Sequence, residues 1–125
     1  MDKGVLDKAQ ARAMYTTFLA STFRTQRFGL SSSHAKGMAL QVNWLLDHGG
    51  FTVGADGRFA VDFAKVKQGV TALTTEIMTI QATGDYARGK ALMERLVVIR
   101  PAVKAMLDRL GDVPVDIAPQ FATEL

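Results

Sequence analysis

The chain has no cysteine among its 125 residues, and this absence removes several kinds of chemistry at once. Disulfide bonds, thiolate zinc sites and cysteine nucleophiles are all excluded. A chain without cysteine is compatible with a reducing compartment, and we therefore predict that the protein is cytoplasmic.

Long apolar runs are also missing. The longest obvious one runs only from Leu96 to Ile99, whereas a membrane-spanning helix needs about 20 apolar residues. The start of the chain does not resemble a signal peptide, because Asp2, Lys3 and Asp7 interrupt it before an apolar stretch develops. We expect no membrane partner, and either a cytoplasmic protein or a piece cut from a larger one.

Charge of either sign is sparse, and the net charge is only +3. Residues 1–50 contain six basic and three acidic side chains, and the remainder contains nine of each, so the whole excess lies in residues 1–50. A nucleic-acid interface normally has denser basic clusters with stacking aromatics, whereas Arg24 and Arg27 stand almost alone. We expect no nucleic-acid partner. These two arginines either offset the dipole at the end of a helix or reach a carboxylate on a ligand or a neighbouring segment.

The spacing of apolar residues predicts a mainly α-helical fold with about five helices and one short β-hairpin. A length of 125 residues suits one domain, and we expect residues 1–125 to form a single helical unit. The expected helices cover about residues 7–27, 33–48, 63–82, 85–96 and 101–111, and the expected strands cover residues 51–53 and 58–61.

Two regions of this pattern carry specific expectations. The clearest helix follows Asp62, which is expected to cap it, and its apolar residues recur at spacings of four and three as in a core helix: Val66, Val70, Leu73, Ile77 and Ile80. After Gly111, two nearby prolines exclude a helix. We expect an extended tail whose apolar residues lie across the body of a protein: Val113, Val115, Ile117 and Phe121.

The second helix contains the histidine of greatest interest. Ser31, Ser32 and Ser33 offer hydroxyls that can cap its start, and Gly49 and Gly50 offer the positive φ that ends it. His34 falls in the first turn, where free N–H groups and the helix dipole favour a neutral imidazole able to contact a bound carbonyl. His34 is either such a substrate contact or a solvated residue near a cap.

Other reactive groups are few: two histidines and the glutamates Glu76, Glu94 and Glu124. A His-Glu-x-x-His pair is absent, and His34 and His48 lie about 21 Å apart along one helix, too far for one metal ion. The Gly54–Gly57 stretch predicts a turn rather than a calcium loop, because the regularly spaced carboxylates and the closing glutamate of a calcium loop are missing. We predict no catalytic residue and no metal ligand in this chain.

Three stretches of the chain resemble the C-terminal part of the dipeptidyl peptidase III family of zinc exopeptidases, in its bacterial form. They are RFGLSSSHAKGMALQVNWLLDHGG, VDFAKVKQGVTALTTEIMTIQATGDYARGKALMERLVVIRPAVKAMLDRL and DVPVDIAPQF. The resemblance extends from about Leu6 to Phe121, and its most specific parts are the His34 helix and the segment ending at Tyr86. Similar sequence also follows the pyrophosphatase domain of some plant Nudix proteins.

This resemblance implies that the chain is part of a helical metallopeptidase lobe. In the family, the zinc ligands and the general base lie upstream, on a His-Glu-x-x-Gly-His helix and on a second helix that carries a glutamate. The resemblance implies that His34 contacts the peptide carbonyl near that zinc. Animal members have an arginine four residues after this histidine, where Met38 stands here, and a longer loop before it.

The expected function is therefore that of a C-terminal segment of a zinc-dependent dipeptidyl peptidase. It would provide scaffold and the substrate contact His34, with zinc held elsewhere and without catalysis by the chain alone. Its expected partners are the remainder of the parent peptidase and an oligopeptide substrate, or a second copy bound through exposed apolar surface. The alternative is a standalone helical interaction or dimerisation module in which His34 has no role.

Overall fold

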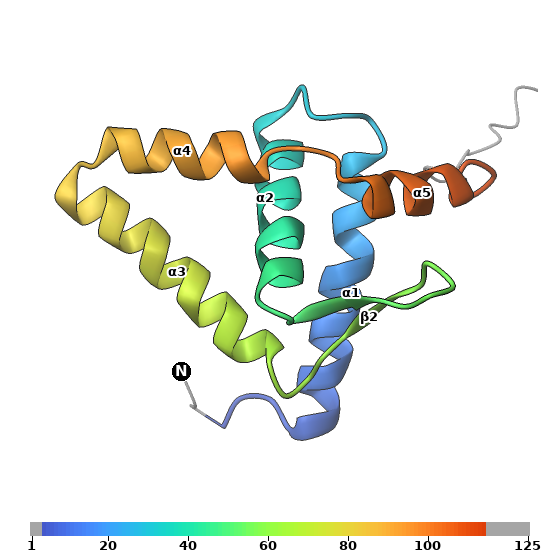
Figure 1. Ribbon diagram of the computed structural model, residues 1–125. Coiled ribbons are helices and arrows are strands. Elements are labelled where there is room, and N and C mark those ends of the chain that lie inside the picture. Colours follow the sequence, from blue (N-terminus) through green and yellow to red (C-terminus); the bar gives the residue numbers. More distant parts are fainter. Residues whose placement is uncertain (1–3, 115–125) are drawn as a thin grey trace, which may run out of the picture.

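A computed structural model describes residues 4–114 (Figure 1). Five helices and a two-stranded antiparallel hairpin follow one another along the chain, and the predicted mainly α-helical class is confirmed. Their bounds are α1 Lys8–Gln26, α2 Ser33–Asp47, β1 Phe51–Val53, β2 Phe59–Val61, α3 Val66–Thr83, α4 Tyr86–Leu96 and α5 Pro101–Arg109.

Local capping explains where α1 and α2 begin. The Asp7 carboxylate accepts from the Gln10 backbone N–H at 2.8 Å, and the Gln10 side chain accepts from the Asp7 N–H at 2.9 Å, which forms a capping box. The Ser32 hydroxyl accepts from the Ala35 N–H at 3.1 Å. The chain leaves α2 through Gly49, whose φ of 71° suits glycine. The predicted serine start and glycine end of α2 are confirmed.

The core lies where α1 and α2 run side by side and the hairpin crosses them (Figure 1). In the hairpin Phe51 pairs with Val61, and Val53 pairs with Phe59. The Phe59 ring meets the edge of Phe23 on α1 at a centroid distance of 4.9 Å. The buried apolar side chains of α1, α2 and β1 include Leu19, Phe23, Ala35, Ala39, Leu40, Val42, Trp44, Leu45 and Phe51.

The predicted start of the third helix at residue 63 is wrong by three residues. The Asp62 carboxylate accepts from the Ala64 N–H at 3.0 Å, and its backbone oxygen accepts from the N–H groups of Lys65 and Val66. Asp62 therefore caps a turn of residues 63–65, and α3 begins only at Val66. The Phe63 ring in this turn lies 4.0 Å beneath the Arg12 guanidinium of α1, a cation–π contact that links the turn to α1.

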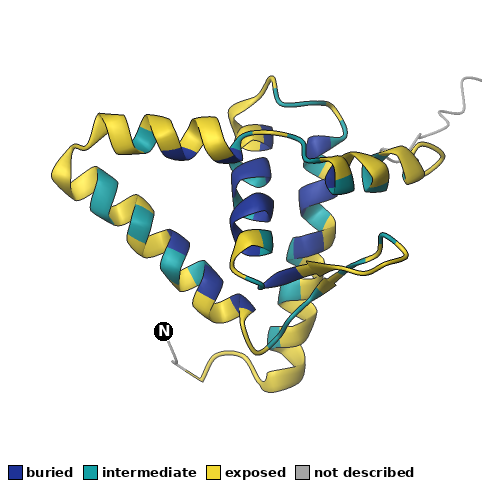
Figure 2. Cartoon of the chain, in the orientation of Figure 1, coloured by how far each residue is buried: buried dark blue, intermediate teal, exposed yellow. Residues whose placement is uncertain are grey.

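Helices α3 and α4 meet at Gly84 and Asp85, where the predicted ranges 63–82 and 85–96 adjoin, and they diverge toward the body (Figure 1). The buried residues of α3 are Val66, Gly69 and Leu73, and those of α4 are Leu92 and Leu96. Residues 74–91, here called the arm, contain no buried residue, as the colours of Figure 2 show. The expectation of a core helix therefore holds only for the first half of α3.

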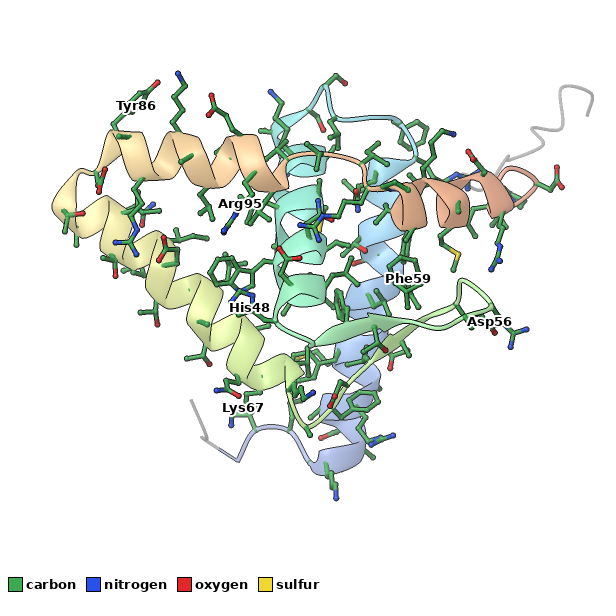
Figure 3. All side chains as sticks on the ribbon, in the orientation of Figure 1. His48, Asp56, Phe59, Lys67, Tyr86 and Arg95 are labelled. Atoms are coloured by element: carbon green, nitrogen blue, oxygen red, sulfur yellow. The ribbon has the colours of Figure 1, made fainter. Side chains whose placement is uncertain are left out.

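Three long-range polar contacts attach the last helix. The Asn43 side chain of α2 donates to the backbone oxygens of Leu96 and Val98 at 2.8 and 2.9 Å. Arg100 forms a bidentate ion pair with Asp47, and Arg109 donates to the backbone oxygen of Asp56 at 2.7 Å. Figure 3 shows Asp56 at the tip of the hairpin.

Most of the expected apolar tail lies outside the described residues. Val115, Ile117 and Phe121 belong to that part, and Val113 is 48% exposed. No helix within residues 4–114 combines the length and apolar character needed to cross a bilayer.

Candidate functional site

His34 is the second residue of α2, and its side chain is exposed. The Ser32 hydroxyl takes the N–H of Ala35, which leaves the N–H groups of Ser33 and His34 without an acceptor inside the helix. The predicted place of His34 in the first turn is confirmed. Its contact with a substrate stays a prediction.

The face of α2 that carries His34 continues into an open groove. Gly37, Gln41 and Leu45 follow His34 at i+3, i+7 and i+11, which places all four residues within about 80° around the helix axis. The groove has a volume of about 630 Å³ and lies between α1, α2 and α3. Its lining consists of Met14, Tyr15, Phe18, Gly37, Leu40, Gln41, Leu45, Val70, Leu73, Thr74 and Ile77.

The groove is apolar, and no charged side chain lines it. Gln41 donates to the Gly37 backbone oxygen at 3.0 Å, and Thr74 donates to the Val70 backbone oxygen at 2.9 Å. Thr74 thus uses its single donor, and Gln41 one of its two amide donors, inside its own helix. Small-molecule sites usually have several polar groups that converge on the ligand, so this lining does not suit a polar ligand.

On another side of α2, Trp44 and His48 form a stacked pair. Their ring centroids lie 4.1 Å apart with an interplanar angle of 16°. The indole N–H donates to the Gly69 backbone oxygen at 3.0 Å, and Nδ1 of His48 lies 2.8 Å from the Trp44 oxygen. Figure 3 shows His48 on the side of α2 that faces α3. His48 therefore helps to join α2 to α3.

Two ion pairs shape the electrostatics around α2 and the arm. Hydrogen bonds from Arg100 hold the pKa of Asp47 below its usual value of 3.8, and hydrogen bonds from Arg88 lower the pKa of Glu76. Arg95 lies on the inner side of α4, whereas Tyr86 points away from the body (Figure 3). The charge of Arg95 lowers the pKa of both carboxylates further.

Arg24 and Arg27 stay apart from these networks. Arg24 is exposed in the last turn of α1, and Arg27 caps its end. Neither forms an ion pair with a residue in the described range 4–114. Their position agrees with the dipole role, and the expected contact with a carboxylate outside the chain stays a prediction.

Sequence reasoning did not find Asn43, the Asp47–Arg100 pair or the Trp44–His48 stack. An asparagine between Val42 and Trp44 is the one signal that could have indicated Asn43, because a buried amide needs partners. Its partners lie 53 and 55 residues away, and spacing along one helix cannot show them.

The described residues do not form a metal site. Within residues 4–114 no three histidine, aspartate or glutamate side chains come close enough together to hold a metal ion. The resemblance places the zinc on another part of the parent polypeptide, and the residues described here do not offer a donor set for it.

The fold and the site together define a helical unit with an exposed first-turn histidine beside an open apolar groove. No protein-family model matches the chain. The chain is 50% identical to dipeptidyl peptidase III from Corallococcus sp. strain EGB, with a TM-score of 0.86 over 95% of its length. It is 40% identical to DPP III from Caldithrix abyssi, with a TM-score of 0.89 over 96% of its length. It is also 44% identical over 121 residues to Nudix hydrolase 3 from Arabidopsis thaliana.

The chain spans only part of these relatives. It covers 22% and 23% of the two solved chains and 16% of the plant protein. In sequence and in fold it matches one segment of dipeptidyl peptidase III. The resemblance stated from the sequence is confirmed.

Proposed function

We propose that the chain is a C-terminal segment of a zinc-dependent exopeptidase of the dipeptidyl peptidase III type. In this role it provides scaffold and one substrate contact, His34, whereas zinc and the general base belong to another part of the polypeptide. The observation that carries the proposal is the identity of 40–50% to two such enzymes across 95–96% of the chain. The proposed partners are the rest of the peptidase and an oligopeptide substrate. Location in the cytoplasm stays a prediction.

The surroundings of His34 support its proposed role. Its side chain is exposed, and no hydrogen bond within the described residues occupies it. An imidazole at a helix N-terminus can donate to a carbonyl oxygen on which negative charge develops. Met38, four residues further on, has no donor and cannot supply a second hydrogen bond there.

A chimera tests this proposal. In the Corallococcus enzyme, this chain replaces the segment that it matches, and release of dipeptides from an arylamide substrate is measured. We expect an active chimera in which His34→Ala lowers kcat/KM about 10-fold to 100-fold, because one donor to the reacting carbonyl is lost.

The matched control in the same helix is His48→Ala, which should change kcat/KM less than about threefold, since His48 stacks on Trp44. Wild-type kcat/KM in the His34→Ala chimera would exclude the proposed substrate contact. An inactive chimera that folds and binds zinc would exclude the proposed contribution of this chain to a working peptidase.

The alternative of a standalone dimerisation module fits the surface less well. Large apolar side chains are exposed on several elements rather than on one face: Val5, Leu6, Met14, Phe28, Val53, Ile77, Met78, Tyr86, Met93, Val98 and Val113. An evolved module should expose apolar groups mainly at one interface. Sedimentation of the isolated chain distinguishes a peptidase segment from a standalone dimerisation module. A segment should associate weakly without fixed stoichiometry, and a module should form one defined dimer.

A further inference from the structure

We propose that the groove between α1, α2 and α3 holds an amphipathic helix from the part of the parent polypeptide outside this chain. The inference rests on the proposed function, since it treats the chain as a segment of a longer peptidase. Beyond the proposed function, a helix of the parent polypeptide would cover the groove and lie next to His34.

The chemistry of the lining selects an apolar occupant. Met14 is 44% exposed and Ile77 is 36% exposed, so apolar side chains at the groove meet water in the chain alone. The Thr74 hydroxyl and one N–H of the Gln41 amide are bonded inside their own helices, so the Tyr15 hydroxyl and the rest of the Gln41 amide are the polar side-chain groups left in the described lining. A charged or strongly polar ligand would lose its water here and gain few partners in return.

The walls of the groove select a helix rather than an extended segment. All three walls are helices, whose backbone N–H and C=O groups are bonded internally. An extended segment would bury its own backbone groups without partners, at a cost of about 1–3 kcal/mol for each. A helix satisfies its backbone itself and presents apolar side chains at i, i+3, i+4 and i+7, which is the helix-in-groove mode of recognition.

Gly37 gives the occupant a place of close approach. It lies inside α2, it lines the groove, and a Cβ atom added to it would meet no atom within 4 Å. Glycine costs about 1 kcal/mol in a helix interior relative to alanine, so its presence here needs a compensating gain. Contact of a second helix with bare backbone would provide that gain.

The size of the relatives identifies the source of the helix. The chain covers less than a quarter of the solved dipeptidyl peptidase III chains, so most of such a polypeptide lies outside it. His34 lies one turn before Gly37 on the same face of α2. A helix seated over Gly37 therefore brings groups of the parent protein beside the His34 imidazole.

The test compares one substitution in two contexts. In the isolated chain, Gly37→Gln should leave Tm unchanged or raise it, because the new side chain enters open space and glutamine favours a helix. In the chimera, the same change should lower Tm by about 3 °C or more, because the side chain displaces the seated helix. The control Lys36→Gln is exposed in the same turn, about 100° around the helix axis from Gly37 and outside the groove lining, and it should leave Tm unchanged in both contexts.

A photo-crosslinking residue, benzoylphenylalanine at position 74, gives a second readout in the chimera. We expect cross-links to a single helix outside this segment. The inference would be overturned, even with an active chimera, if no cross-link forms or if the cross-link reaches an extended segment or a second molecule. Equal Tm values for the Gly37→Gln and Lys36→Gln chimeras would overturn it too. A folded, cross-linked chimera that releases no dipeptide would overturn only the proposed function. A chimera that does not fold would contradict both.

Discussion

Asn43 joins α2 to the region where α4 passes into α5. It is 1% exposed, and its amide group donates to the oxygens of Leu96 and Val98. Its own oxygen, Oδ1, is buried and has no partner within the described residues. The amide therefore stabilises the fold through its two N–H donors. They bond the backbone oxygens of Leu96 and Val98 at the connection between α4 and α5.

Replacement of Asn43 by alanine should lower the free energy of unfolding by about 2–3 kcal/mol, because buried carbonyl oxygens lose their donors. Urea unfolding followed by the fluorescence of Trp44, the single tryptophan, measures this change. Gln41→Ala is the control, since that side chain bonds only its own helix, and it should cost about 0.5 kcal/mol or less. Equal losses in the two variants would contradict the joining role of Asn43.

The Asp47–Arg100 pair makes stability depend on pH. Because Arg100 lowers the folded-state pKa of Asp47 below 3.8, the stabilisation is present above that value and is lost as the pH falls through the folded-state pKa. Arg100→Gln should cost about 0.5–1 kcal/mol near pH 7, a small value because both side chains are partly exposed. In urea unfolding over a pH series, the difference between wild type and variant should shrink progressively as the pH falls below 3.8 and should vanish once Asp47 is protonated in the folded state. A difference that does not change with pH would exclude this cause.

At the scale of elements, the arm differs from the rest of the fold because none of its residues is buried, although Ile80 packs partly against the core. The ion pair between Glu76 and Arg88, with Nε to Oε1 at 2.7 Å, connects its two helices. The turn between the helices depends on Gly84, whose φ is 64°, and on Asp85, which accepts from the Arg88 N–H at 2.9 Å. Polar contacts thus replace apolar burial in residues 74–91.

Glu76→Gln should loosen the arm and leave α2 intact, because it removes the charged acceptor of Arg88. Hydrogen exchange should become several-fold faster for amides in residues 74–91 and should not change in α2. Glu94→Gln breaks only the exposed contact with Lys90 and serves as the control. Unchanged exchange in the arm of the Glu76 variant would show that the ion pair does not hold it.

Sequence reasoning found the elements whose ends are determined locally. Ser32 and Gly49 act through neighbours within a few residues, so the sequence around them predicts where α2 begins and ends. The start of α3 was misplaced because Asp62 caps a turn of residues 63–65, whereas the cap rule places the helix directly after its cap. The groove could not be predicted either, since it depends on how α1, α2 and α3 cross.

At the scale of the whole molecule, the exposed apolar groups and the open groove have one explanation. Several elements expose large apolar side chains, and the arm contains no buried residue. A segment that completes a larger helical lobe would cover such surfaces with the rest of that lobe. The place of His34 was predictable from the serines before it, whereas its position beside the groove follows only from the fold.

The most direct test of the segment role compares release of dipeptides by the isolated chain and by the chimera, each with added zinc. The isolated chain should show no release above its His34→Ala variant, whereas the chimera should cleave the substrate. Zinc-dependent release by the isolated chain, abolished in the His34→Ala variant, would contradict the role of a completing segment.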